Sequence, residues 1–182
     1  MVVASPLLGA IIAGGRAQRF GRDKGAALLG GISLIDHIAA ALRPQVDKVI
    51  VVGRAWPGLD RVDDAPHAGL GPLGGLSAAL IYAAERGYSA VLTAGCDTFP
   101  VPQDLVAQLG SCPAVIENHY LFGLWPVSLA KSLSAHIAQQ SDHSLRYWIA
   151  CSGARQIPVQ QQFANLNTED DLSRYAEILS SS

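Results

Sequence analysis

Glycines and basic residues cluster directly after the first apolar run of the chain. Residues 8–13 are apolar over a length typical of a buried strand, and the run ends at Gly14-Gly15. Five charged residues follow, all but one of them basic: Arg16, Arg19, Arg22, Asp23 and Lys24. Glycines let backbone N–H groups approach an anion closely, and nearby cations add charge. The stretch therefore predicts an anion site, with phosphate as the expected ligand, rather than an ordinary solvated loop.

The spacing of these residues resembles a known signature. The run Ile12-Ala13-Gly14-Gly15-x-x-x-Arg19-x-Gly21-x-x-Lys24 is similar to the LAGGxxxRxGxxK pattern of the nucleotidyltransferase superfamily. Glycine at position 14, where many relatives have alanine, makes the pattern most similar to the molybdenum cofactor guanylyltransferase family. No Gly-Lys-Ser/Thr closes the run, so it is not a Walker loop.

A second candidate site follows a later apolar run. Residues 90–94 predict a buried strand that delivers Gly95-Cys96-Asp97-Thr98 to its carboxyl end, before Pro100 and Pro102. Ligands of open α/β sheets bind at that edge, where a carboxylate can hold a divalent cation. The arrangement resembles the family's magnesium-binding acid, which implies Mg²⁺ at Asp97. A simple helix cap is the alternative for this residue.

Residues 56–75 are rich in Gly, Pro and Asp, which predicts an irregular segment. They lead into a helix that is expected to start at Pro72 and end near Gly87. Within the segment, Gly69-x-Gly71-x-x-Gly74 matches the dinucleotide fingerprint letter for letter. That fingerprint needs a strand immediately before its first glycine, and here Asp-Ala-Pro-His precedes it. A nicotinamide-dependent oxidoreductase is therefore disfavoured.

Asp64 precedes this glycine-rich stretch. In the resembled family a GPLxG stretch follows an acid at the same distance and lines the nucleotide pocket, which implies nucleotide contacts from Asp64 and Gly74. A carboxylate could select guanine, because it accepts hydrogen bonds from the N1–H and the exocyclic amine that guanine alone presents together. The chain departs from the family after residues 48–52, the second predicted strand, where relatives have an asparagine and this chain has Val52-Gly53-Arg54.

The last signature lies near the carboxyl terminus. Residues 163–172 have the sequence Phe-Ala-Asn-Leu-Asn-Thr-Glu-Asp-Asp-Leu, which is similar to the family's FxNxNTxxDL pattern. Thr168 and Asp171 predict a capping box for a closing helix that reaches about Leu179. Capping accounts for those two residues but not for Asn165 and Asn167, which the resemblance implies point toward the site and bind the acceptor.

The remaining pattern alternates strands and helices. Ser33 predicts the cap of a helix that Pro44 stops, and further helices are expected at 103–109, 126–140 and 144–149. Strands are expected at 113–118, 120–124 and 156–159, and the close spacing of the first two allows an antiparallel pair. We expect an α/β, single-domain, Rossmann-like nucleotidyltransferase fold over residues 1–182. Its sheet should be mostly parallel, with helices on both faces and one antiparallel element.

Composition excludes several classes of protein. The chain has 182 residues, a net charge of -2 and 49% hydrophobic residues, which favours a folded core and gives no reason to expect nucleic acid as a partner. Three cysteines without a C-x-x-C pair indicate neither a disulfide framework nor zinc, so we expect a cytoplasmic protein. Residues 1–13 have no basic start and contain Pro6, which disfavours a signal peptide, and no apolar run is long enough to span a membrane.

The resemblance implies an activity and a set of site residues. The expected reaction transfers GMP from GTP to the terminal phosphate of molybdenum-molybdopterin with Mg²⁺, forms the guanine dinucleotide and releases pyrophosphate. The residues implied for catalysis are Arg19, Lys24 and Asp97, of which Asp97 holds the metal. The residues implied for nucleotide binding are Ile12, Ala13, Gly14, Gly15, Lys24, Asp64, Gly74 and Asp97. Asn165 and Asn167 are expected to bind the acceptor.

Several alternatives remain open at the level of the sequence. A relative could use CTP with molybdopterin, or a sugar 1-phosphate as the acceptor. A catalytically silent paralogue would bind nucleotide only, although the presence of Lys24 and Asp97 disfavours it. Because molybdopterin is large and labile, transfer within a complex with a molybdoenzyme or its chaperone is a further expectation.

Overall fold

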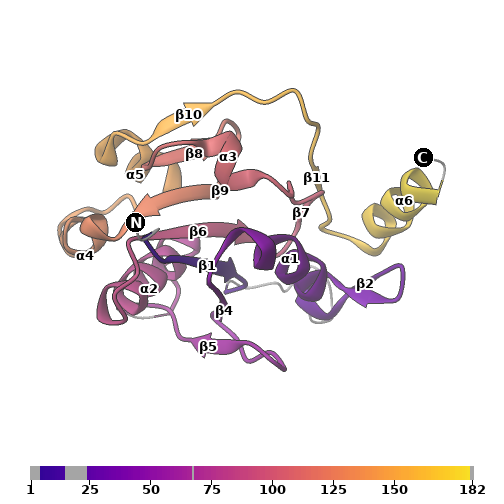
Figure 1. The fold of residues 1–182 in the computed structure, drawn as a ribbon, viewed down its shortest axis with the longest axis horizontal. Coiled ribbons are helices and arrows are strands. Elements are labelled where there is room, and N and C mark those ends of the chain that lie inside the picture. The colour runs from indigo at the N-terminus through magenta and orange to yellow at the C-terminus, as the bar shows by residue number, and fades with distance from the viewer. Residues whose placement is uncertain (1–4, 15–23, 67, 181–182) are drawn as a thin grey trace.

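The computed structural model describes residues 5–14, 24–66 and 68–180. Its centre is a seven-stranded sheet with the order β10-β8-β9-β6-β1-β4-β5 (Figure 1). The strands are β1 (Leu7–Ile12), β4 (Lys48–Val52), β5 (Asp60–Val62), β6 (Ala90–Gly95), β8 (Ala114–Ile116), β9 (His119–Pro126) and β10 (Arg155–Ile157). Strand β9 runs antiparallel to β6 and β8, and the other pairings in this sheet are parallel. The predicted α/β fold with one antiparallel element is confirmed.

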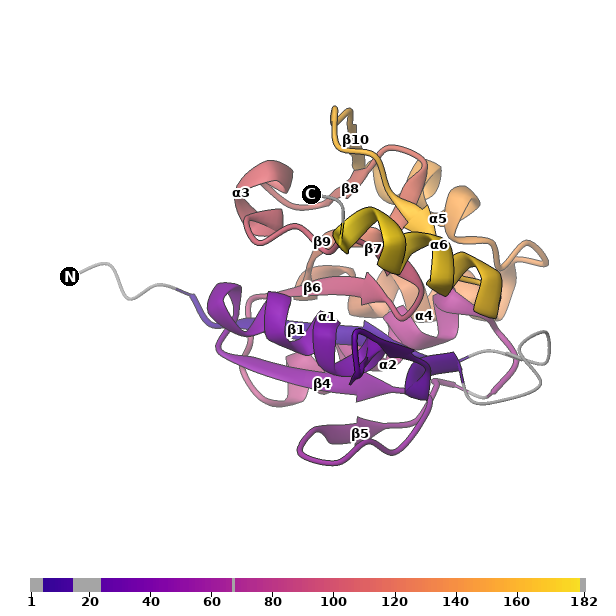
Figure 2. The same ribbon diagram turned by 90° about the vertical axis from the view of Figure 1, so that its right-hand side faces the viewer.

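Helices cover both faces of the sheet. They are α1 (Leu34–Leu42), α2 (Pro72–Glu85), α3 (Leu105–Leu109), α4 (Ala130–Gln139), α5 (Leu145–Ser152) and α6 (Glu169–Ser180). One hydrophobic cluster contains buried residues of α1, α3 and α6, and a second contains those of α2, α4 and α5. Figure 2 shows the same two layers, with α1 and α6 in front of the sheet and α2 and α4 behind it.

The central strands form because their residues are apolar on both faces. All six residues of β6 are buried, as are five of the six residues of β1, which is typical of a parallel sheet covered by helices on each side. Helix α1 begins where predicted, since the Ser33 hydroxyl accepts a hydrogen bond from the Asp36 N–H at 3.1 Å. No helix in the described part of the chain has the length and apolar character needed to cross a membrane.

Smaller elements extend from the sheet edges. They are the 3₁₀ helices η2 (Lys24–Ala26), η3 (Arg43–Gln45) and η4 (Val127–Leu129), and the short strands β2 (Leu28–Leu29), β3 (Ile32–Ser33), β7 (Thr98–Phe99) and β11 (Ala164–Asn165). Strands β7 and β11 pair antiparallel, with Asn165 opposite Thr98. This pairing brings the carboxyl-terminal signature next to the segment that follows β6.

Three sequence-based expectations were wrong in detail. The segment 56–75 is not irregular throughout, because β5 pairs with β4 as a parallel edge strand whose Asp60 and Arg61 are exposed, so it has no apolar pattern to detect. The helix expected at 126–140 starts at Ala130, since Pro126 ends β9 and the turn η4 follows it. Helix α3 starts at Leu105 rather than at residue 103.

Candidate active site

Four residues of the predicted site region lie just beyond the carboxyl ends of four adjacent strands. In the strand register, Ile12 lies opposite both Gly95 and Val52, and Val52 lies opposite Val62. Neighbouring strands are about 4.8 Å apart, so the chain leaves these four strand ends side by side. The positions two residues further on belong to the loops at this edge of the sheet. Those positions are Asp97, Gly14, Arg54 and Asp64. The carboxyl edge of four adjacent parallel strands thus carries two acids, a glycine and an arginine, at the edge where ligands of open α/β sheets bind.

Asp64 packs against the start of the glycine-rich loop. A Cβ atom placed on Gly14 would lie 3.0 Å from each oxygen of the Asp64 carboxylate, which leaves no room for alanine without movement of the acid. On the other side, a Cβ on Gly75 of α2 would lie 3.7 Å from Asp64 Oδ1, an ordinary contact distance, but 2.8 Å from Ile12 Cγ2. Glycine at position 14 therefore leaves room for the carboxylate, and glycine at position 75 lets α2 pack closely on β1.

The Asp64 carboxylate is only partly satisfied within the described residues. Its Oδ1 atom is buried and has no hydrogen-bond partner among them. Burial raises the pKa of Asp64, and the neighbouring Asp63 raises it further. A buried acceptor without a partner is costly unless a ligand or water donates to it. Asp64 is thus suited to receive hydrogen bonds from a bound group.

The glycines before α2 shape the helix start and not a dinucleotide turn. Gly71 is the N-cap of α2 with φ +59°, and Pro72 follows in the first turn. A Cβ on Gly74 would lie 3.0 Å from Leu70 Cβ and 3.7 Å from Asp64 Cβ, so Gly74 packs beside the acid, and its contact with a nucleotide stays a prediction. Strand β5 ends at Val62, well before Gly69, which agrees with rejection of the dinucleotide fingerprint.

Asp97 is tied to the carboxyl-terminal signature through Thr98. Thr98 Oγ1 lies 3.0 Å from Asn165 Oδ1 and 3.3 Å from Asp97 Oδ1, so the hydroxyl proton is shared between an amide oxygen and a carboxylate oxygen. The Asp97 carbonyl also accepts a hydrogen bond from the Leu166 N–H at 2.7 Å. These contacts place Asn165 next to Asp97, although the two residues are far apart in the sequence.

Asn167 lies in the cap of α6. Its N–H and the N–H of Thr168 both donate to Asp171 Oδ2 at 2.9 Å, and the Thr168 hydroxyl accepts from the Asp171 N–H at 3.1 Å. The predicted capping box is therefore confirmed, and its hydrogen bonds lower the pKa of Asp171. The Asn167 side chain is exposed, so its role toward an acceptor stays a prediction.

Part of the predicted nucleotide loop falls outside the description. Gly15 and Arg19 lie outside the described residues, and so does the side chain of Lys24, whose backbone begins η2. At the entrance of the loop, the Ala13 N–H donates to the Val52 carbonyl at 3.0 Å, so this N–H is part of the hydrogen bonding between β1 and β4. Ile12 is buried in the core at the end of β1. Among the residues with described positions, no group of three or more His, Cys, Asp or Glu side chains could hold a metal by itself.

Thr98 is the site residue that sequence reasoning missed. Its hydroxyl position depends on the β7–β11 pairing, which joins residues 67 positions apart in the chain. Each of these strands has two residues, too few to show a strand pattern. The available indication was a hydroxyl residue directly after the acid of the CDxxxxP stretch.

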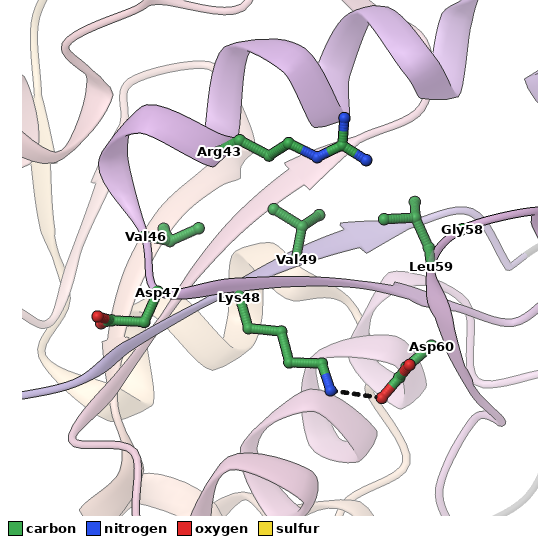
Figure 3. A pocket seen from close by; sticks show the side chains of 8 residues that line it. All are labelled: Arg43, Val46, Asp47, Lys48, Val49, Gly58, Leu59 and Asp60. Atoms are coloured by element: carbon green, nitrogen blue, oxygen red, sulfur yellow. Dashed lines mark hydrogen bonds and ion pairs between the residues drawn. The ribbon is translucent and has the colours of Figure 1, made fainter.

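A cavity of about 320 Å³ lies at the opposite edge of the sheet (Figure 3). Its lining includes Lys48 at the start of β4 and Asp60 at the start of β5, whose side chains form an ion pair at 2.6 Å. Parallel strands place their starts and their ends on opposite edges, so this cavity is separate from the edge where Gly14, Asp64 and Asp97 lie.

The fold and the acids at the carboxyl edge of its sheet agree with a nucleotidyltransferase, the class to which the family match assigns this chain. A family model described as "MobA-like NTP transferase domain" matches residues 9–159, which include most of β1 and both Asp64 and Asp97. The chain therefore belongs to the MobA-like NTP transferase family, and the resemblance found in the sequence is confirmed.

Individual relatives agree with this assignment. A molybdenum cofactor guanylyltransferase of Rhizobium leguminosarum bv. trifolii (strain WSM2304) is 33% identical over 93% of this chain and 91% of that protein. A protein of the same name from Rhodobacter capsulatus is 36% identical over 92% of this chain and 94% of its own. The crystal structure of molybdopterin-guanine dinucleotide biosynthesis protein A from Archaeoglobus fulgidus has a TM-score of 0.72 at 22% identity, covering 96% of this chain and 100% of that one. This last likeness supports the fold.

Proposed function

We propose that this protein transfers GMP from GTP to the terminal phosphate of molybdenum-molybdopterin, which forms the guanine dinucleotide and releases pyrophosphate. The observation that carries the proposal is the partly buried Asp64 carboxylate, which has an oxygen without a partner among the described residues and lies against Gly14. Asp97 follows a strand that ends at the same edge of the sheet. The names of the relatives support the same activity.

Asp64 is the proposed guanine contact. Guanine presents two adjacent donors, N1–H and the exocyclic amine, whereas adenine and cytosine present a donor beside an acceptor on the corresponding edge. A carboxylate accepts both guanine hydrogen bonds and repels an acceptor. These hydrogen bonds would satisfy the buried Oδ1 atom and offset the desolvation that raises the pKa of Asp64.

The triphosphate is proposed to lie between the loop and Asp97. Gly14, Gly15, Arg19 and Lys24 would hold its phosphates with backbone N–H groups and cations. The donor set at Asp97 fits Mg²⁺, which proteins hold through one or two carboxylates together with substrate phosphates, so a cluster of three acids is not needed. When bound, Mg²⁺ would neutralise phosphate charge and polarise the reacting phosphoryl group.

The acceptor is proposed to approach from the side of Asn165 and Asn167. Asn165 already shares the Thr98 hydroxyl with Asp97, so an acceptor phosphate bound there would lie near the phosphates held at Asp97. A phosphate monoester is largely ionised at pH 7, so it can attack the α-phosphorus without a general base. The contribution of the chain is then positioning and charge. Delivery by a molybdoenzyme or its chaperone in the cytoplasm belongs to this proposal.

The test is pyrophosphate release from GTP, CTP, ATP and UTP, each with Mg²⁺ and molybdenum-molybdopterin. The proposal predicts release from GTP that requires both the metal and the acceptor. Release mainly from CTP would overturn the guanine assignment, and release with a sugar 1-phosphate instead of molybdopterin would overturn the acceptor. Asp64→Asn should reduce the preference for GTP over ATP by about tenfold, since one accepting oxygen becomes a donor. An unchanged preference would indicate that backbone groups, and not Asp64, select guanine.

A further inference from the structure

The corner after β4 contacts both ends of the glycine-rich loop. At the entrance, Gly53 packs directly on Gly14, and a Cβ on Gly53 would overlap the Gly14 Cα and N atoms. Gly53 has φ +88°, and its N–H donates to the Val62 carbonyl at 2.8 Å. The asparagine of the resembled family could not be placed at Gly53 without displacing Gly14. The departure from the family pattern is therefore built into the packing of this corner.

At the exit of the loop, the next residue of the corner makes the contact. A Cβ on Gly25, the residue after Lys24, would lie 2.7 Å from Arg54 Nη1 and 2.6 Å from Ile35 Cδ1. Gly25 is buried, and Arg54 is partly buried. The Arg54 guanidinium thus packs against the backbone of η2 at the point where Lys24 enters the fold.

A tryptophan, itself hydrogen-bonded to an aspartate, packs on the guanidinium. Arg54 Cζ lies 5.2 Å from the centre of the Trp56 ring, a cation–π distance. The Trp56 Nε1–H donates to Asp36 Oδ1 at 2.9 Å, and the Ser33 hydroxyl donates to Asp36 Oδ2 at 2.7 Å. These hydrogen bonds lower the pKa of Asp36 and keep its carboxylate charged in the first turn of α1. The arginine is therefore fixed from the side of α1.

We propose that Arg54 is a positioning residue that sets the exit of the nucleotide loop, and hence the place from which Lys24 reaches the triphosphate. Gly53 fixes the entrance of the loop on Gly14, and Arg54 fixes its exit at Gly25. The planar guanidinium suits this role because it packs between an aromatic ring and a backbone, which an ammonium group cannot do as well. The proposal rests on the proposed function for the ligand, but its structural part stands on described contacts alone.

The binding test compares GTP with GMP by calorimetry in the presence of Mg²⁺. Arg54→Ala should weaken GTP binding about tenfold and leave GMP binding within about twofold, because only the longer ligand carries the phosphates that Lys24 is proposed to hold. In a Lys24→Ala background, Arg54→Ala should add less than about twofold. Arg54→Lys should behave like Arg54→Ala. Arg86→Ala is the matched control, since Arg86 is stacked on Tyr82 at 3.7 Å near the end of α2.

Each contrary result overturns the proposal. Equal weakening of GMP would place Arg54 at the nucleoside, full additivity with Lys24→Ala would make it a phosphate ligand in its own right, and rescue by lysine would show that a simple cation suffices. If the wild-type protein does not bind GTP at all, the proposed function itself is overturned.

Hydrogen exchange of the protein without nucleotide separates the two failures. Amides in a peptide covering residues 24–29 should exchange about fivefold faster in Arg54→Ala than in the wild type or Arg86→Ala, because the exit of the loop loses its support. Unchanged exchange would overturn the positioning role whatever nucleotide the protein binds.

Discussion

On the side of the site proposed for the nucleotide, here called the nucleotide side, Gly14 and Gly53 meet backbone to backbone. On the side proposed for the acceptor, the acceptor side, Asp97 and Asn165 meet through the hydroxyl of Thr98. The first contact is set by the register of adjacent long strands and tolerates no Cβ atom. The second depends on two strands of two residues each and on hydrogen bonds of side chains. From this difference we expect the nucleotide side to be the more rigid one and the acceptor side to be easier to rearrange, which would suit the large acceptor proposed.

The largest expected effect is on catalysis at the point where the two sides meet. Asp97→Asn should lower pyrophosphate release from GTP about a hundredfold or more, because the residue proposed to hold the metal loses its charge. Asp47→Asn is the matched control, since the Asp47 carboxylate accepts the Leu7 N–H at 2.7 Å at the opposite edge of the sheet. Equal activity of the two variants would show that Asp97 does not belong to the active site.

The rigidity of the nucleotide side can be measured by a pair of alanine substitutions. Gly53 and Gly58 both have positive φ, +88° and +75°, but only a Cβ on Gly53 would meet other atoms. Gly58→Ala should cost about 1 kcal/mol of backbone strain in the free energy of unfolding, and Gly53→Ala about 3 kcal/mol, because overpacking adds to the strain. Chemical denaturation measures both values. Similar losses would show that the Gly14–Gly53 contact relaxes easily.

The acceptor side should respond more weakly. Asn165→Ala removes one acceptor of the Thr98 hydroxyl and should lower the free energy of unfolding by about 1 kcal/mol. In a Thr98→Val background the same substitution should cost almost nothing, since the hydroxyl is already absent. A full additional loss in the double variant would mean that Asn165 stabilises the fold by another contact.

Much of the nucleotide side could be predicted from the sequence. Strands β1, β4 and β6 are continuous apolar runs, and the residues after them carry short signatures at fixed spacing, so their meeting at one edge follows from a parallel sheet. Strand β5 was missed because its exposed Asp60 and Arg61 leave no apolar pattern. The expectation that Asp64 contacts the nucleotide therefore came only from the family resemblance, and its position beside Gly14 was not predicted.

The acceptor side and the loop supports could not be predicted in the same way. The contact of Thr98 with Asn165 spans 67 positions and depends on strands too short for a periodic pattern. The contact of Gly53 with Gly14 depends on how closely two backbones approach, and the contact of Arg54 with Gly25 on how closely a side chain approaches a backbone. Sequence spacing carries no information on such distances, whereas it does indicate which strand ends share an edge.

The smallest expected effect concerns the cost of the buried carboxylate. Asp64→Asn should raise the free energy of unfolding at pH 7 by about 0.5 kcal/mol, because a neutral amide loses less hydration than a partly exposed carboxylate. Burial raises the pKa of Asp64 in the folded protein, so the folded state favours the protonated acid and loses stability as the pH rises through that pKa. The advantage of the variant should therefore vanish at low pH, below both the folded and unfolded pKa values. An advantage that is independent of pH would have another cause.

The most direct measurement is a crystal structure of the protein with Mg²⁺ and a GTP analogue whose α,β bridge is a methylene group. The account predicts that the guanine edge donates to the Asp64 carboxylate, that the phosphates lie toward residues 14–25, and that the metal contacts Asp97. A nucleotide bound at the other edge of the sheet, such as in the cavity between Lys48 and Asp60, with Asp64 and Asp97 free of ligand, would contradict it.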